Sequence, residues 1–172
     1  MNVYLISVQN VKDNAFIDNN TDDKTVKLAL LQAQEQILEP AIGTPLYEKL
    51  LSGIVEGSMA TAYQNLILNK IYKVLIYGTQ YMVARNLLMR MTNSSIVQDG
   101  NTNSTAISIS DLNTMRNEFE ISYKHHLNKL NMYLLDNQAT FPEYLASDTD
   151  GFEANAVTPA INFYYDGPEI TQ

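Results

Sequence analysis

The sequence predicts a mainly α-helical fold: a small helical bundle with an inserted β-hairpin or long loop and extended arms at both termini. Along the longest segments, apolar residues recur at spacings of three and four, as on one face of a helix. Residues that favour turns separate these segments. With 172 residues and 45% hydrophobic content, the chain suits one domain with one core. We therefore expect a helical domain over residues 1–145 and a C-terminal arm over residues 146–172.

The N-terminal arm covers about the first 20 residues. Residues 3–6, VYLI, favour a short strand, and Ser7 can cap the short helical segment VQNVKDN. The first long helix is expected to begin at Thr21 or Asp22, whose side chains can accept bonds from unpaired N–H groups. Pro40 is expected to end it, because proline lacks the N–H that continues a helix. The apolar face of this helix comprises Val26, Ala29, Leu30, Ala33 and Ile37, with Gln34 largely outside it.

A helix corner follows within residues 33–53, AQEQILEPAIGTPLYEKLLSG. Gly43 supplies the turn, Thr44 can cap a second helix, and Pro45 stands at its first position, where a fixed φ and a missing N–H cost little. This second helix is expected to run to Gly53. The corner motif, which we interpret as structural, comprises Pro40, Gly43, Pro45 and Tyr47.

Two further helices are predicted. Residues 61–90 form the longest, and its apolar surface is too wide for a single stripe, so it is expected to be buried on most sides. Gly78 within it costs about 1 kcal/mol relative to Ala, which favours close packing of a neighbouring helix there. The last helix begins at Ser110 or Asp111 and ends near Leu135. Its recurring residues are Leu112, Met115, Phe119, His126, Leu130, Tyr133 and Leu134.

The insertion between these helices, about residues 92–110, is small and polar. Near its end, isoleucines alternate with serines, which is the period of a strand. Asp99-Gly100 favours a turn, so residues 96–97 and 106–109 can pair as a β-hairpin, with an unpaired loop as the alternative. A hairpin this small is marginal alone in water, so we expect it to contact a neighbouring subunit. The contact residues predicted here are Ile96, Val97, Asp99, Gly100, Ile107 and Ile109.

The C-terminal arm is acidic and aromatic. The chain has a net charge of −8, and all 11 of its Lys and Arg residues lie at or before Lys129. Because no basic stripe is present to neutralise phosphates, direct nucleic-acid binding is disfavoured. Segments that stay disordered are usually poor in aromatic residues, so we interpret this one as a binding arm. Its predicted contact residues are Phe152, Phe163, Tyr164 and Tyr165.

The sequence offers little for catalysis. Without cysteine there is no disulfide or thiolate zinc site. His125 and His126 are adjacent, so on a helix they point about 100° apart and cannot easily hold one ion. The phosphate-binding loop, the dinucleotide-binding motif and the nucleophile elbow are all missing. We expect no catalytic, cofactor-binding or metal-binding residue and no enzyme; a hydrolytic site built from His125, His126, Glu118 and Glu120 is the least favoured hypothesis.

The predicted order of elements resembles that of head-tail connector proteins of tailed bacteriophages, most closely the neck or ring proteins of crAss-like phages. The resemblance covers roughly residues 3–145, and the segments FIDNNTDDK and FPEYL strengthen it. The phrase that carries it is formed by Ala33, Gln34, Ile37, Pro40, Ile42, Gly43, Leu46, Tyr47 and Leu50.

This resemblance implies a structural virion protein, an adaptor that forms a homo-oligomeric ring in the phage neck between portal and tail. By the same resemblance the ring is dodecameric, binds the portal protein and other neck or tail proteins, and extends the DNA channel, through which DNA passes without specific binding. It implies no cofactor and no membrane, with assembly in the host bacterial cytoplasm. Two alternatives stay open: a monomeric helical-bundle module that binds another protein, and a tail-completion protein.

Overall fold

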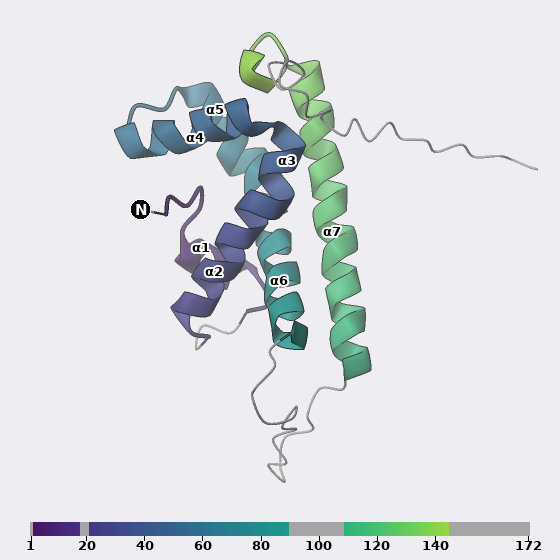
Figure 1. Ribbon diagram of the computed structural model, residues 1–172. Helices are drawn as coiled ribbons and strands as arrows, with labels where there is room; N and C mark the ends of the chain where they lie inside the picture. The colour runs from purple at the N-terminus through teal and green to yellow at the C-terminus, as the bar shows by residue number, and fades with distance from the viewer. Residues whose placement is uncertain (1, 18–20, 90–108, 145–172) are drawn as a thin grey trace, which may run out of the picture.

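The computed structural model describes residues 2–17, 21–89 and 109–144 (Figure 1). Within these ranges the chain is mainly helical and contains no strand, which confirms the predicted fold class at the level of mainly α. The C-terminal arm over residues 146–172 lies outside the described residues, as does nearly all of the insertion over residues 92–110.

The N-terminal arm packs on the bundle of its own chain. Its first helix, α1 (Val8–Asn14), begins as predicted, because the Ser7 hydroxyl accepts a hydrogen bond from the backbone N–H of Asn10 at 3.1 Å. The strand predicted over residues 3–6 is wrong, since this stretch is irregular and pairs with a side chain instead of with another strand.

The first long helix is built from three consecutive elements: α2 (Asp23–Ala33), a π-helical turn η1 (Gln34–Leu38) and α3 (Glu39–Ile42). Asp22 caps it as predicted, accepting a hydrogen bond from the backbone N–H of Lys24 at 3.2 Å. Pro40 does not end the helix, contrary to the prediction. It follows the π-helical turn and lies in the first turn of α3, where a missing N–H costs little.

The corner ends one helix and begins the next at Gly43, which has a φ of 81°. Next comes α4 (Thr44–Glu56), which runs across the direction of α2 (Figure 1). Gly43, not Thr44, occupies the cap position, and Pro45 lies in the first turn. The helix passes Gly53 and ends at Gly57, whose φ of 65° is left-handed, so the predicted end at Gly53 is wrong.

The segment predicted as one long helix over residues 61–90 is helical throughout its described part. It consists of α5 (Thr61–Leu66), a second π-helical turn η2 (Ile67–Ile71) and α6 (Tyr72–Met89). The last long helix is α7 (Ile109–Asp136), which with 28 residues exceeds any other uninterrupted helix in the described ranges. A short 3-10 helix, η3 (Pro142–Tyr144), closes the described chain.

The predicted hairpin is contradicted at its last residue, because Ile109 is the first residue of α7. The apolar residues that recur from Leu112 onward set a helical period, and this period extends back over Ile109 and Ser110. Thr114 then donates a hydrogen bond from its hydroxyl to the Ser110 carbonyl at 3.1 Å, as a residue inside a helix does. Ile96, Val97, Asp99, Gly100 and Ile107 lie outside the described residues.

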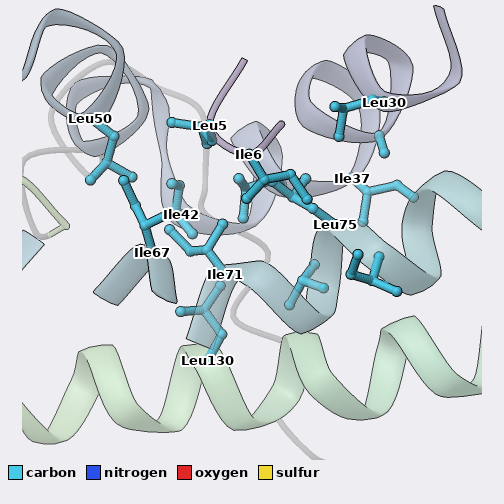
Figure 2. Packing of buried hydrophobic residues seen from close by; sticks show 14 of the residues in the cluster. Leu5, Ile6, Leu30, Ile37, Ile42, Leu50, Ile67, Ile71, Leu75 and Leu130 are labelled. Carbon is cyan, nitrogen blue, oxygen red and sulfur yellow. The ribbon is translucent and has the colours of Figure 1, made fainter. Parts of the chain in front are cut away.

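The core lies around α6, which packs between α2 and α7 (Figure 1). Leu130 of α7 points toward Ile71 of η2, and Leu75 lies one turn farther along (Figure 2). All three side chains are fully buried. Burial of this kind stabilises the fold by about 1.5–3 kcal/mol for each large aliphatic side chain. The arm adds Leu5 and Ile6 to the same cluster.

Gly78 confirms the predicted close approach of two helices. A Cβ atom at this position would lie 3.2 Å from Ile37 Cδ1 and 3.4 Å from Ala33 Cβ. The backbone of α6 therefore touches the side chains of α2 and η1 directly, which a residue with a larger side chain would prevent.

Replacing Gly78 with leucine is expected to destabilise the protein by about 1 kcal/mol, measured by urea denaturation. Overpacking costs about 1–3 kcal/mol, while the better helix propensity of leucine returns somewhat less than about 1 kcal/mol. Ser52→Leu, at an exposed position of α4, is the matched control and should be close to neutral. Equal unfolding midpoints for the two variants would show that the gap beside Gly78 accepts a side chain.

Candidate interaction surface

Gln34 lies at the centre of the corner and is fully buried. Its Oε1 accepts a hydrogen bond from the Leu5 N–H at 2.8 Å, and its Nε2 donates to the Val3 carbonyl at 3.1 Å and to the Tyr47 hydroxyl at 3.3 Å. A side-chain amide offers both a donor and an acceptor, so it pairs with the arm as a neighbouring strand would. Gln34 thus fixes the N-terminal arm to the corner.

The sequence prediction left Gln34 outside the apolar face of its helix, which is wrong. Its neighbour Ala33 was assigned to that face, and the π-helical turn that begins at Gln34 rotates the next side chains relative to an α-helix. Tyr47 is also buried, and burial raises the pKa of its hydroxyl, with the hydrogen bond to Gln34 acting in the opposite direction. The corner motif therefore serves the fold, as the sequence predicted for Tyr47.

A second buried junction fixes the end of the described chain. The Tyr63 hydroxyl donates a hydrogen bond to Glu143 Oε2 at 2.7 Å, and the Tyr63 ring meets Phe141 edge-on at 5.3 Å between centroids. The pKa of Tyr63 is raised to about 12, mainly by burial and secondly by the hydrogen bond to the Glu143 carboxylate and its negative charge. Because η3 also packs against α4, residues 141–144 are held by two elements. The chain is therefore fixed to the bundle up to Tyr144.

One side of α7 packs on α6, and the opposite side carries large apolar residues without cover in the described structure. Ile121 is 70% exposed, Met132 65% and Leu135 53%. They belong to a row of exposed residues at alternating spacings of four and three, the pattern of helices that pack against another element. We call this row the α7 outer face; it comprises Ile121, His125, Asn128, Met132 and Leu135.

Two lysines lie within the stretch of α7 that carries the outer face, and acids flank it at Glu120 and Asp136. Between Ile121 and Leu135, α7 contains Lys124 and Lys129 and no acidic residue. Lys124 forms an ion pair with Glu120, one turn earlier in the same helix. The surface therefore combines exposed apolar side chains with lysines.

The two histidines do not form a binding site with one another. His126 is partly buried and stacks on the Tyr77 ring, with 5.2 Å between centroids and 9° between planes, whereas His125 is exposed. Burial lowers the pKa of His126, and His125 and the lysines nearby act in the same direction. His126, which the sequence placed among the recurring residues of this helix, thus lies on the packed side of α7, and His125 lies on the outer side. In residues 2–17, 21–89 and 109–144, no group of three His, Cys, Asp or Glu side chains could hold a metal ion.

Nearly all of the contact residues predicted from the sequence lie outside the residues that the structure describes. Phe152, Phe163, Tyr164 and Tyr165 are in the undescribed C-terminal arm. Of the insertion's predicted contacts only Ile109 falls in a described element, α7. The outer face of α7, in contrast, was missed, although the spacing of Ile121, Met132 and Leu135 is visible in the sequence. These residues lie outside the recurring apolar set from which the helix was predicted, so the periodicity assigned them no contact.

A protein-family model described as "Family of unknown function (DUF6712)" matches residues 38–151. The match begins within the corner and extends past η3. No curated protein and no solved structure matches the chain. No helix in the described ranges is long and apolar enough to cross a membrane.

Proposed function

We propose that this chain, which belongs to the DUF6712 family of unknown function, is a structural protein of a phage virion. In this proposal it is a head-tail connector: copies form a ring in the neck between portal and tail, extend the DNA channel and dock tail components. The portal and other neck or tail proteins are its partners, and the ring is dodecameric by resemblance to connectors.

The observation that carries the proposal is the corner phrase between residues 33 and 50, through which the sequence resembles phage connectors. In the folded chain these residues have architectural roles. Gln34 holds the arm, Gly43 adopts a backbone conformation that favours glycine, and Leu46 is fully buried. A resemblance concentrated in such residues supports a common helical scaffold more than a common chemistry.

The surface of the scaffold suits a subunit of an assembly. The outer face of α7 exposes large apolar side chains that a partner would cover. Heterologous contacts between identical subunits close into a ring when the rotation between them permits. The net charge of −8 also suits a wall around passing DNA, because negative charge repels phosphate.

The test is co-expression of the chain with the portal protein of the same phage, followed by negative-stain electron microscopy of the purified complex. We expect a ring on one end of the portal with twelvefold rotational averages. The portal alone and the chain alone are the controls. A chain that stays monomeric and does not bind the portal would contradict the proposal and favour a monomeric binding module. A ring that binds only tail proteins would favour a tail-completion protein.

A further inference from the structure

We propose that the α7 outer face is the docking site for residues 146–172 of a second copy of this chain. This inference rests on the proposed function, because it names the contact by which subunits of a homo-oligomer join.

The apolar content of the two partners is complementary. Ile121 and Met132 are separated by three turns of α7 and remain mostly exposed, so the face offers apolar contacts along its length. The C-terminal segment supplies apolar anchors of a matching kind. Aromatic side chains of this type bury a large area at a small entropic cost and dominate many interfaces. The anchors are Phe152, Ile161, Phe163, Tyr164 and Tyr165.

The charges of the two partners are opposite. Between Ile121 and Leu135, α7 contains Lys124 and Lys129, with acids only at the flanking positions Glu120 and Asp136, while residues 146–172 contain acids and no Lys or Arg. Opposite charges steer partners together and fix their register, and like charges reject the wrong partner. The α4 surface, which also exposes Ile54 and Val55, carries Glu48 and Glu56 against the single Lys49, so it offers this segment less favourable charge. The acids of the segment are Asp148, Asp150, Glu153, Asp166 and Glu169.

The length of the segment allows it to reach a second copy. At about 3.3–3.6 Å per residue, an extended chain from residue 146 to 172 reaches about 90 Å. The outer face from Ile121 to Leu135 spans about 21 Å at a helical rise of 1.5 Å per residue. The segment starts from η3, which the Tyr63–Glu143 hydrogen bond fixes to the bundle. The reach therefore exceeds the length of the face about fourfold, which leaves enough chain to extend from η3 to the α7 outer face of a second copy.

Disulfide trapping in the full-length chain tests the contact, because the natural sequence contains no cysteine. Two single variants, Met132→Cys and Tyr164→Cys, are mixed in equal amounts and oxidised with diamide, with and without the portal present. The matched control replaces Met132→Cys with Leu68→Cys, since Leu68 on η2 has the same 65% exposure. Thermal melting followed by circular dichroism first establishes that each variant has the same melting temperature as the natural protein.

The expected result is a cross-linked species containing one copy of each variant, at least five times more abundant than with Leu68→Cys. Its yield should fall when Lys124 and Lys129 are both changed to Glu. Equal yields for Met132→Cys and Leu68→Cys in both conditions would overturn the inference. So would a double variant, Met132→Cys with Tyr164→Cys, that closes only within one chain.

The outcomes separate this inference from the proposed function. A ring on the portal without the Met132–Tyr164 cross-link would overturn the docking site and leave the connector function standing. A cross-linked oligomer that never binds the portal would support the docking site and count against the connector function.

Discussion

Replacing Gln34 with leucine is expected to lower the free energy of unfolding by about 3 kcal/mol. The change leaves the Leu5 N–H, the Val3 carbonyl and the Tyr47 hydroxyl without the partner they have in the folded chain. A buried group that loses its hydrogen bond costs about 1–3 kcal/mol. If the arm detaches to avoid this cost, Leu5 and Ile6 lose their burial, worth about 1.5–3 kcal/mol each. Either response weakens the fold substantially.

Urea denaturation followed by circular dichroism measures the loss, and limited proteolysis reports whether cleavage moves to residues 2–7. Gln36→Leu is the matched control, because Gln36 lies in the same π-helical turn but is exposed and bonded to Arg85. Its effect should stay within about 0.5 kcal/mol. Indistinguishable stabilities for the two leucine variants would mean that Gln34 does not hold the arm.

Gly43→Ala is expected to cost about 3 kcal/mol, because φ 81° with ψ 147° is a conformation that L-residues rarely adopt. The corner cannot relax easily, since the residues on both sides are helical and Ile42 and Leu46 are fully buried. For a chain of this length such a loss lowers the melting temperature by about 6–12 °C.

Gly57→Ala is the comparison that isolates the corner. Gly57 is also left-handed, with φ 65° and ψ 18°, but a Cβ there meets nothing within 4 Å. Its cost should be about 1–2 kcal/mol, the penalty of the left-handed region alone. If thermal melting gave Gly43→Ala a smaller shift than Gly57→Ala, the corner would not be the strained element we describe.

The sequence was a good guide where one residue decides a local feature. Ser7 and Asp22 cap helices because their oxygens meet N–H groups close by in the chain, and Gly78 marks a close contact because few other features explain glycine inside a helix. Such signals need no knowledge of distant residues. Predictions based on these local signals therefore agree with the structure.

Features that depend on register or on distant partners were not predictable. The π-helical turn before Pro40 rotates the side chains that follow it relative to an α-helix, so they contact different neighbours. The 3.6-residue spacing of apolar residues in the sequence does not indicate this turn. The burial of Gln34 depends on an arm about 30 residues away, with which it forms hydrogen bonds. Ile121, Met132 and Leu135 of the α7 outer face have the same chemistry as core residues, so only the packed structure separates them from the core.

The hydrogen bond between Tyr63 and Glu143 also determines how the domain responds to mechanical tension. A pull on the chain beyond Tyr144 acts first on Phe141 and Glu143, which are joined to the long helix that begins at Thr61. The force is thus shared by two elements far apart in sequence before it can peel α7 from α6. A domain built this way would transmit load through its bundle while α7 stays in place, and Tyr63→Phe would lower the force at which η3 detaches.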